Sequence, residues 1–341
     1  MTAESRRVRA ALLHGPRALT VEERAAASPG PGEAVVRVIG SGLCGTDYRI
    51  WNGDRPVRYP LVMGHEMVGR VVATGAGVDN VRAGDKVAVE PNYACGHCPL
   101  CVEGNRNLCL RRVTVGIDED GGFADEVRVP ARLCWPAPAH LADDALLFAE
   151  PLAVVARAVR RGDARPGQSA AVVGAGTLGL LAVQALRASG LRVLAVGRTE
   201  RRLDVARKVG AEAVATTLGG GHGEAARAFS GREGVDLVIE TAGTAEAVEQ
   251  AVELARPGGR IVLTGLPHEP SHVHFFPVVR RELAILGSMI YQDEFPEAIR
   301  LLATGAVTTG PLLTHRVALD AIASAFEAHR APESIKVAVF P

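Results

Sequence analysis

The second half of the chain, from about residue 169, alternates short apolar runs with helical stretches. The runs and stretches cover residues 170–173, 178–188, 191–196, 201–209, 235–239 and 260–263. Strands that follow one another through helices pair in parallel, because a parallel connection needs a crossover of a dozen or more residues. The pattern therefore predicts an α/β fold with a doubly wound parallel sheet that has helices on both faces. A strand over 283–287 and a helix around 294–303 are expected to follow.

A glycine-rich turn follows the first of these strands. Ala171-Val172-Val173 leads into Gly174-Ala175-Gly176-Thr177-Leu178-Gly179, and a helical pattern comes next. A G-x-G-x-x-G that closes a strand and opens a helix is typical of dinucleotide binding, because its glycines let the backbone approach a pyrophosphate at the positive end of the helix. The alternative is a glycine turn with no ligand. We expect cofactor contacts at Gly174, Gly176, Thr177, Leu178 and Gly179.

Residues 1 to about 150 have a different texture. Short β-like segments over 35–39, 68–73, 86–90 and 124–129 are separated by turns such as Pro29-Gly30-Pro31-Gly32. A chain of 341 residues also exceeds the size at which one hydrophobic core keeps growing. We therefore expect two domains, a β-rich one and the α/β one.

Four of the six cysteines form a compact cluster. Cys95, Cys98, Cys101 and Cys109 have the spacing C-x2-C-x2-C-x7-C, which can bring four thiolates around one tetrahedral ion. Four sulfur ligands leave no open coordination position, so a zinc ion here would have a structural role. An iron–sulfur cluster and unrelated buried cysteines are the alternatives. This use of cysteine favours a reducing compartment over a disulfide framework.

A second set of metal-ligand types lies outside this cluster: Cys44, His65, Glu66 and Glu150. Each residue alone is a weak signal, because single residues of these types more often serve packing or lie in solvent. Together they match a catalytic zinc, which takes three ligands of mixed sulfur, nitrogen and oxygen type and keeps one position open. Spacing along the sequence does not show whether they meet in space.

The order of the motifs resembles that of the medium-chain dehydrogenase/reductase superfamily. The motifs are the cysteine cluster, the glycine turn, Cys44-Gly45-Thr46-Asp47, Gly64-His65-Glu66, Gly84-Asp85-Lys86-Val87 and Glu150-Pro151-Leu152. Residues from about 9 to 339 look like a member of its zinc alcohol/polyol dehydrogenase branch. Glu150 stands where ordinary alcohol dehydrogenases carry a second cysteine, which is similar to sorbitol, threonine and butanediol dehydrogenases. The tail over 281–291 and 310–315 is also similar to butanediol and threonine dehydrogenases.

The resemblance implies a domain plan and the roles of the catalytic residues. A β-rich, GroES-like catalytic domain would comprise residues 1–152 and 291–341, and a Rossmann dinucleotide-binding domain residues 153–290. Cys44 and His65 would bind the catalytic zinc, with Glu66 and Glu150 either coordinating it or holding its water. Thr46 would take the substrate proton first. Arg49 occupies the place of a relay histidine and cannot give up its proton at working pH, so the outer relay must take another route.

The segment after the second α/β strand bears on the choice of cofactor. An acidic residue contacts the ribose of NAD in proteins of this fold, and the resemblance implies that its position in this chain is Gly197. Gly197 has no carboxylate and is followed by Arg198 and Arg202. A guanidinium suits a 2′-phosphate, so we expect NADP to be preferred, with NAD usable if these arginines only coat the helix start. The family positions that touch the nicotinamide half are Thr264, Gly265, Leu266, Ser288 and Met289.

The function implied by the resemblance is a zinc-dependent, NAD(P)-linked dehydrogenase. Its zinc would stabilise a secondary alcohol, diol or polyol as the alkoxide while a hydride leaves for the nicotinamide ring, or polarise the matching ketone in reverse. The alternatives are an NADP-dependent carbonyl or cyclitol reductase of secondary metabolism and a cofactor-binding protein without catalysis. Two zinc ions per chain would favour the enzyme, and one the binding protein.

Charge and hydropathy exclude several kinds of partner. Lysine plus arginine equals aspartate plus glutamate at 38 each, so the basic footprint of a nucleic-acid-binding protein is missing. No apolar run reaches the roughly 18 residues of a membrane span, and the first residues lack the apolar centre of a signal peptide. We expect a cytoplasmic protein that binds a small alcohol or ketone. The resemblance implies a homo-oligomer, either a dimer or a tetramer.

Overall fold

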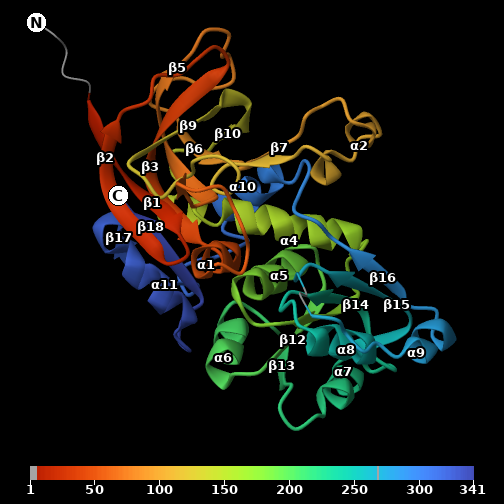
Figure 1. Ribbon diagram of the computed structural model, residues 1–341. Helices are drawn as coiled ribbons and strands as arrows, with labels where there is room; N and C mark the ends of the chain where they lie inside the picture. The colour runs from red at the N-terminus through yellow and green to blue at the C-terminus, as the bar shows by residue number, and fades with distance from the viewer. Residues whose placement is uncertain (1–5, 267–268) are drawn as a thin grey trace, which may run out of the picture. The chain divides into compact units, whose positions relative to one another are not determined.

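The computed structural model describes residues 6–266 and 269–341. The chain forms two compact units: unit 1 comprises Met1–Glu150 and Leu313–Pro341, and unit 2 comprises Pro151–Leu312. Each unit has its own sheets (Figure 1). Each also has its own clusters of buried hydrophobic side chains. Among the described residues, every helix is too short or too polar to cross a membrane.

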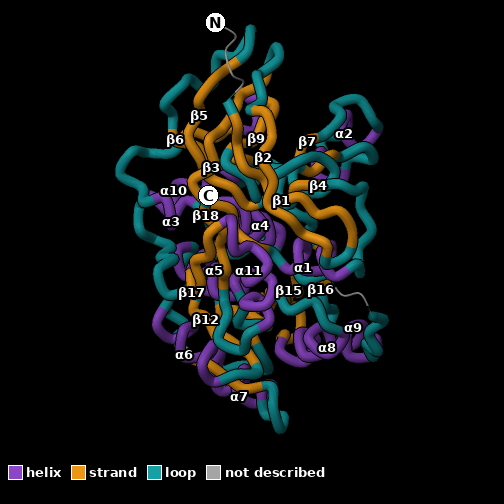
Figure 2. Tube along the Cα trace, turned by 60° about the vertical axis from the view of Figure 1, so that its left-hand side comes forward, coloured by secondary structure: helices purple, strands orange, loops and turns teal. Residues whose placement is uncertain are grey.

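Unit 1 is rich in β-structure (Figure 2). Its strands are β1 (Arg7–Gly15), β2 (Ala18–Ala25), β3 (Glu33–Leu43), β4 (Leu61–Val62), β5 (Glu66–Thr74), β6 (Lys86–Val89), β7 (Asn92–Tyr93), β8 (Val113–Thr114), β9 (Glu126–Pro130), β10 (Cys134–Pro136), β17 (Leu313–Ala318) and β18 (Lys336–Phe340). Its helices are α1 (Gly45–Asn52), α2 (Pro99–Val102), α3 (Asp143–Leu146) and α11 (Ile322–Arg330), with 3-10 turns at Arg106–Leu108, Ala131–Leu133 and Leu319–Ala321.

The main sheet of unit 1 joins both ends of the chain. Its strand order is β10-β6-β5-β3-β18-β17, β9 also pairs with β3, and a smaller sheet has the order β2-β1-β4. β18 runs antiparallel to β3 with Val337 opposite Leu43, and β3 runs antiparallel to β5 with Gly42 opposite Glu66. Residues near 43, 66 and 336 are therefore brought together at one end of three adjacent strands.

Unit 2 is the parallel α/β unit that the alternating pattern predicts. Its strands are β11 (Ser169–Val173), β12 (Arg192–Gly197), β13 (Ala213–Thr216), β14 (Val235–Glu240), β15 (Ala255–Leu263) and β16 (Ala284–Gly287). Its helices are α5 (Thr177–Ala188), α6 (Glu200–Lys208), α7 (His222–Ser230), α8 (Ala245–Leu254), α9 (Phe275–Arg280) and α10 (Phe295–Ala303), while α4 (Ala149–Arg161) begins in unit 1.

All strand pairs in this sheet are parallel, in the order β13-β12-β11-β14-β15-β16. α5 contacts α6, and α7 contacts α8, while each of these four helices also packs on strands of the sheet. Aliphatic residues predominate in the strands, and Ala170, Val172 and Ile239 are all at most 1% exposed, because a parallel sheet is covered on both faces. The prediction of a doubly wound parallel sheet is confirmed.

The boundary between the units differs from the expected domain boundary. Residues 291–312, expected with the catalytic domain, form part of unit 2. The reason lies in polar contacts: Glu294 accepts hydrogen bonds from Arg157 (3.4 Å) and Arg160 (3.2 Å), and the side-chain oxygen of Gln184 accepts one from the backbone N–H of Thr308 (2.7 Å). These contacts tie α10 and the following loop to α4 and α5.

A half-buried aspartate at the start of β14 gives unit 2 a pH-dependent contribution to stability. Asp236 accepts hydrogen bonds from the N–H (2.9 Å) and hydroxyl (2.8 Å) of Ser169, and from the guanidinium of Arg256 (2.7 Å). Burial by itself would raise the pKa of Asp236, but these donors lower it below its ordinary value. A lowered pKa in the folded chain stabilises the fold above the unfolded-state pKa, and this stabilisation is lost as the pH falls through the folded-state pKa.

We therefore expect Asp236→Asn to lower the free energy of unfolding of unit 2 at pH 7 by about 1–3 kcal/mol, because the donors lose a charged acceptor. Urea unfolding at pH 7 and at pH 3.5 measures the difference between wild type and variant, which should shrink at the lower pH. A difference that stays constant would show that the carboxylate charge does not act as described.

Candidate active site

The centre of unit 1 brings together a thiol, an imidazole and a carboxylate. The candidate ligand atoms of Cys44, His65 and Glu66 all lie within 4.8 Å of one another. Cys44 follows β3 and caps the N-terminus of α1, His65 precedes β5, and Glu66 opens that strand. His65 and Glu66 are buried, whereas Cys44 is partly exposed. Sulfur, nitrogen and oxygen donors at this separation suit a zinc ion.

A buried aspartate fixes two members of this group. Asp47 is fully buried, and one of its oxygens accepts a hydrogen bond from the backbone N–H of Cys44 (2.8 Å). Its other oxygen lies 3.2 Å from Nδ1 of His65. Burial opposes protonation, but the charge of Asp47 raises the pKa of His65 well above its ordinary value. A carboxylate behind a histidine orients the ring and makes it a stronger ligand.

Lys336 completes the site, and our sequence-based prediction did not include it. Its ammonium forms an ion pair with Glu66 and donates a hydrogen bond to the carbonyl of Leu43 (3.3 Å), while the residue is only 3% exposed. Burial would lower the pKa of Lys336, yet the charges of Glu66, Cys44 and Glu150 raise it. A lysine at the start of an otherwise apolar strand, Val337-Ala338-Val339, is the one signal that the sequence offered.

Glu150 lies beside this group rather than within it. It is the second residue of α4, it is buried, and its charge reaches Lys336. Glu150 does not belong to the group of Cys44, His65 and Glu66, whose ligand atoms all lie within 4.8 Å of one another. Thr46, the expected first proton acceptor, lies in the first turn of α1 two residues after Cys44, and its hydroxyl has no hydrogen-bond partner among the described residues.

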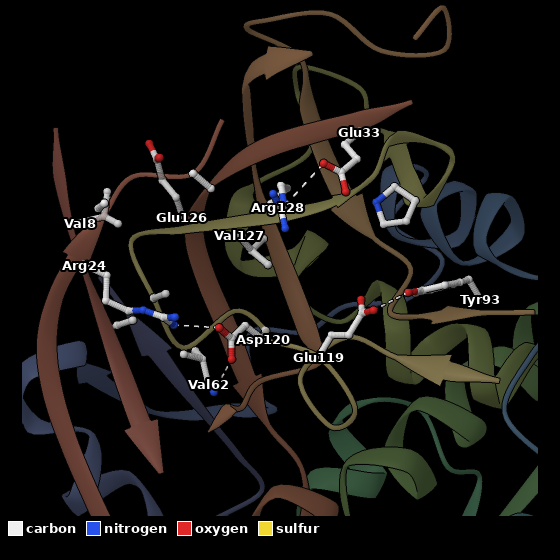
Figure 3. Close-up of a pocket in the computed structure, with 16 residues that line it drawn as sticks. Val8, Arg24, Glu33, Val62, Tyr93, Glu119, Asp120, Glu126, Val127 and Arg128 are labelled. Carbon is white, nitrogen blue, oxygen red and sulfur yellow. Dashed lines mark hydrogen bonds and ion pairs between the residues drawn. The ribbon is translucent and has the colours of Figure 1, made fainter. Parts of the chain in front are cut away.

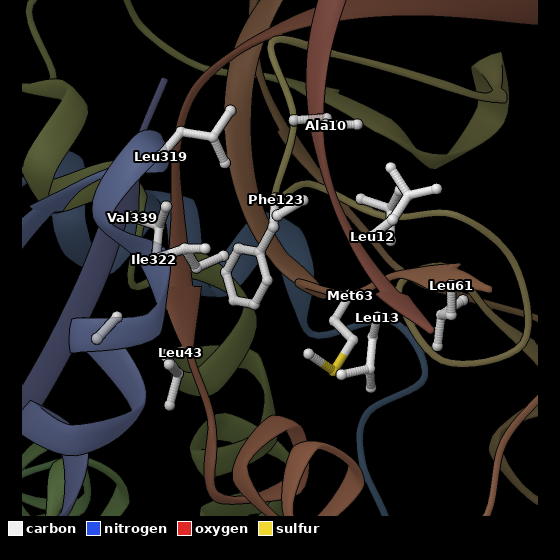
Figure 4. Close-up of a cluster of buried hydrophobic side chains, with 14 of the residues drawn as sticks. Ala10, Leu12, Leu13, Leu43, Leu61, Met63, Phe123, Leu319, Ile322 and Val339 are labelled. Carbon is white, nitrogen blue, oxygen red and sulfur yellow. The ribbon is translucent and has the colours of Figure 1, made fainter. Parts of the chain in front are cut away.

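The core and one glycine hold the ligand segments in place. Leu43 and Met63, which directly precede the segments of Cys44 and His65, are at most 1% exposed in a hydrophobic cluster with Leu13 and Phe123 (Figure 4). A side chain at Gly42 would collide with the Glu66 carboxylate, so only glycine leaves room for it. The site is therefore built on strand ends that a packed core supports.

The cysteine cluster forms a second candidate metal site. Its four sulfurs lie within 4.8 Å of one another, and the Cys98 sulfur is 3.4 Å from that of Cys101 and 3.9 Å from that of Cys109. Tetrahedral zinc with Zn–S bonds of about 2.3 Å needs sulfurs about 3.8 Å apart. Backbone N–H groups of Leu110 and Cys101 lower the pKa of Cys98 to about 6, which favours the thiolate that binds metal. All six cysteines of the chain are free.

The glycine turn in unit 2 has the shape of a phosphate cradle. Gly174 has a positive φ of 101°, and a Cβ there would lie 2.8 Å from the hydroxyl of Thr241. A Cβ on Gly179 would collide with the carbonyl of Gly174, so glycine allows α5 to start close to β11. A Cβ on Gly176 would meet nothing within 4 Å. The turn thus leaves open space at the N-terminus of α5, where Thr177 and Leu178 present their backbone N–H groups.

Two arginines line the cavity beyond this turn. A cavity of 330 Å³ is bordered by the glycine turn, by Gly197 at the end of β12, and by Arg198 and Arg202. Burial lowers the pKa of Arg202, and repulsion by the charge of Arg198 lowers it further. A negatively charged ligand would relieve that repulsion. Glu246, which also borders the cavity, accepts a hydrogen bond from the side chain of Gln250 (3.0 Å).

The remaining predicted cofactor residues lie at the carboxyl ends of neighbouring strands. Thr264, Gly265 and Leu266 follow β15, and Ser288 and Met289 follow β16. The hydroxyls of Thr264 and Ser288 are buried and have no hydrogen-bond partner among the described residues. Ligands of open α/β sheets bind at this edge, and buried hydroxyls without partners fit a ligand that can pair with them.

A larger cavity in unit 1 does not share these features. It measures 550 Å³ and lies beside β1, β2 and β9 (Figure 3). Its charged side chains already have partners: Arg24 pairs with Asp120 (2.8 Å), and Arg128 with Glu33 (3.5 Å). Volume alone therefore does not mark a site here.

The histidines near residue 270 show no metal group among the described residues. His272 and His274 are absent from the groups of potential ligands in that part of the chain, and His268 lies outside the described residues.

Fold and site together define a class of protein, an enzyme with a β-rich zinc-site unit and a parallel dinucleotide-binding unit. Comparison with known families agrees. Residues 30–139 match the alcohol dehydrogenase GroES-like domain, and residues 177–304 match the zinc-binding dehydrogenase family. The chain belongs to the zinc-dependent alcohol and polyol dehydrogenases of the medium-chain dehydrogenase/reductase superfamily, and it is an oxidoreductase that acts on CH–OH groups.

Individual relatives match almost the whole chain. Starvation-sensing protein RspB of Escherichia coli is 34% identical over 92% of this chain and 93% of its own length. Sorbitol dehydrogenase of Bacillus subtilis is 32% identical over 98% of this chain and 97% of its own. Among solved structures, a zinc-binding dehydrogenase from Sinorhizobium meliloti bound to NADP matches with a TM-score of 0.95 and 34% identity, covering 98% of this chain and 100% of that one.

Proposed function

We propose that this chain oxidises a secondary alcohol, diol or polyol with a nicotinamide cofactor, or reduces the matching ketone, with the help of a catalytic zinc ion. The observation that carries the proposal is the group of Cys44, His65 and Glu66, oriented by Asp47 and Lys336. A protein that only bound the cofactor would have no need for a thiol, a buried imidazole and a buried carboxylate gathered in this way.

The donor set fits a catalytic rather than a structural ion. Cys44 and His65 would be the zinc ligands, and Glu66 and Glu150 would coordinate the ion or hold its water. Lys336 occupies one oxygen of Glu66, which leaves fewer protein ligands than a closed site has. A zinc ion held there supplies a Lewis acid that stabilises negative charge on the substrate oxygen. The cysteine cluster would hold a second, structural zinc ion.

Thr46 would take the substrate proton. Its hydroxyl lies in the first turn of α1, close in sequence to Cys44, and has no competing partner among the described residues. A hydroxyl can accept one proton while it passes on another, so it carries no charge between steps. Arg49 lies one helical turn further along α1. Because a guanidinium does not give up its proton, the proton cannot pass onward through this side chain.

We propose NADP as the preferred cofactor. The support is that the guanidiniums of Arg198 and Arg202 border the same cavity and that Gly197 stands where a carboxylate would be. The Sinorhizobium relative binds NADP, but the RspB structure was solved with NADH, so relatives alone do not decide the cofactor.

The cofactor proposal predicts a specific loss in two variants. Arg198→Ser and Arg202→Ser should each lower kcat/KM for NADP by about tenfold or more, because each removes a charge-assisted contact with the 2′-phosphate. The value for NAD, which lacks this phosphate, should change far less. Initial rates with both cofactors measure the ratio. Equal losses with NAD and NADP would contradict the assignment of the arginines to the 2′-phosphate.

The activity itself is tested with a panel of secondary alcohols and polyols in the presence of NAD or NADP, followed by cofactor absorbance. We expect turnover that disappears when the metal is removed by a chelator and returns with added zinc. Turnover that persists without metal would contradict the proposed role of the zinc ion.

The proposal extends to assembly and compartment. β16 is the edge strand of the sheet in unit 2, and the nearby α9 exposes Phe275, Phe276 and Val279 by 61–75%. An apolar edge strand beside an exposed apolar helix favours pairing with another copy, so we propose a homo-oligomer, either a dimer or a tetramer. Free cysteines gathered as metal ligands fit the reducing cytoplasm.

A further inference from the structure

A second pocket of unit 1 is lined by two arginines whose charge is not paired within the described residues. It measures 470 Å³ and is lined by Arg55, Pro56, Val57, Arg58, Ile117 and Asp118. All of these residues belong to unit 1. The side chains of Arg55 and Arg58 have no hydrogen bond or ion pair with any described residue. Arg24 and Arg128 of the same unit, by contrast, each form an ion pair with a carboxylate.

Two backbone connections link the segments that line this pocket to the segments of the candidate active site. On one side, α1 starts at the Cys44 cap, and the carbonyl of Arg49 in its last turn accepts the N–H of Arg55 (3.2 Å). An eight-residue helix is only about 12 Å long. On the other side, a Cβ on Gly116 would lie 3.0 Å from the amide nitrogen of His65, so the chain that leads to Ile117 touches the His65 backbone.

The lining of the pocket combines apolar and basic side chains. Ile117 is part of the hydrophobic cluster of unit 1, and Val57 packs against that cluster. Arg55 and Arg58 line the pocket together with Asp118, whose carboxylate accepts the N–H of Thr114 (2.8 Å) and thereby closes a turn. A carbon chain that ends in an anion matches such a lining.

Further arginines around α1 increase the positive potential. The guanidinium of Arg49 also lacks a partner among the described residues, that of Arg17 lies over the ring of Trp51 (5.2 Å), and that of Arg330 lies over the ring of Tyr48 (5.3 Å). None of the three forms an ion pair within the described part of the chain. The acids of this segment are engaged, since Asp47 faces His65 and Asp54 accepts a hydrogen bond from Asn52 (2.9 Å). A net positive cleft attracts and retains anions.

We propose that the pocket of Arg55 and Arg58 binds the anionic end of the substrate, so that the substrate is a hydroxy compound bearing a carboxylate or a phosphate. The inference rests on the proposed function, because it assigns a substrate class to the same site. A guanidinium binds both groups with paired, charge-assisted hydrogen bonds.

The test compares three six-carbon compounds that differ mainly at one end: sorbitol, gluconate and sorbitol 6-phosphate. With the zinc-loaded full chain and NADP, kcat/KM for at least one anion should exceed that for sorbitol about tenfold or more. Comparing kcat/KM for gluconate with that for sorbitol 6-phosphate decides whether the pocket prefers a carboxylate or a phosphate. A neutral polyol that is used as well as both anions would overturn the inference and leave the proposed dehydrogenase function intact.

The variants Arg55→Gln and Arg58→Gln should each lower the anion-to-sorbitol ratio of kcat/KM about tenfold, mainly through KM. Arg82→Gln, which removes one charge from a side chain that is 90% exposed elsewhere in unit 1, is the matched control and should keep the ratio. A ratio that is unchanged in both pocket variants would overturn the inference.

Equilibrium binding separates the inference from the proposed function. Calorimetric titration with gluconate and with inorganic phosphate needs no turnover. If no compound is oxidised with either cofactor, the proposed function fails, but an anion that binds wild type and not the Arg55→Gln/Arg58→Gln double variant still supports the anion pocket. Equal binding to wild type and double variant, or no binding to either, overturns it.

Discussion

Replacing His65 by alanine is expected to lower kcat/KM for alcohol oxidation by about a thousandfold or more and to reduce the zinc content from about two ions per chain to about one. The imidazole is one of three donors in the Cys44, His65 and Glu66 group, and the carboxylate of Asp47 orients it. Losing the Lewis acid costs several kcal/mol of transition-state stabilisation, and each 1.4 kcal/mol is about tenfold in rate. Metal analysis and initial rates measure both effects on one preparation.

His14→Ala is the matched control for this variant. His14 is an exposed histidine of unit 1 that pairs with Glu22 (2.8 Å) and belongs to neither group of metal-ligand residues. It should keep both the rate and the zinc content. A His65→Ala enzyme that retains two zinc ions and a near-normal rate would refute the assignment of His65 as a ligand.

The second large effect is expected at Lys336. Lys336→Met should lower the free energy of unfolding of unit 1 by about 3–5 kcal/mol, because Glu66 would keep a buried charge without its partner. Glu66 and Lys336 are at most 3% exposed, so water cannot replace the lost ammonium. Denaturant unfolding of the full chain, followed by probes in unit 1, measures the change.

The double variant Lys336→Met/Glu66→Gln provides the control for this stability effect. It removes the unpaired charge, so it should recover a large part of the loss even though it has two substitutions. If the single and double variants are equally destabilised, packing of the lysine stem rather than the ion pair explains the effect. A single variant as stable as wild type would contradict the described role of Lys336.

The sequence was most informative where one local pattern determines the structure. Aliphatic strands that alternate with helices commonly form one parallel sheet, and unit 2 contains such a sheet. The glycine turn likewise requires only the geometry of a strand followed by a helix. The four cysteines between Cys95 and Cys109 need no distant residue, and their sulfurs do gather as their spacing predicted.

The parts that the sequence did not reveal depend on contacts between distant segments. Lys336 is 270 residues from Glu66, and only the pairing of β18 with β3 and of β3 with β5 brings them together. The N-terminal hairpin of β1 and β2 was also missed, because its outer strand is polar and shows little hydrophobic alternation. The boundary near residue 312 depends on hydrogen bonds to Gln184 and on the ion pairs of Glu294.

The pairing of distant residues also explains why spacing along the sequence could not show whether the ligands of the second metal site meet in space. Cys44 and His65 are separated by a helix, a loop and a short strand, and nothing local forces them together. The core residues Leu43 and Met63 set their positions instead. Patterns that depend on core packing cannot be counted along the chain, so the resemblance to a known family carried that prediction.

Anomalous diffraction at the zinc absorption edge, from crystals grown with zinc, tests the central claim most directly. We predict two peaks per chain, one among the sulfurs of Cys95, Cys98, Cys101 and Cys109, and one within bonding distance of the Cys44 sulfur and a ring nitrogen of His65. A single peak at the four-cysteine site, with the Cys44 and His65 side chains apart, would contradict it.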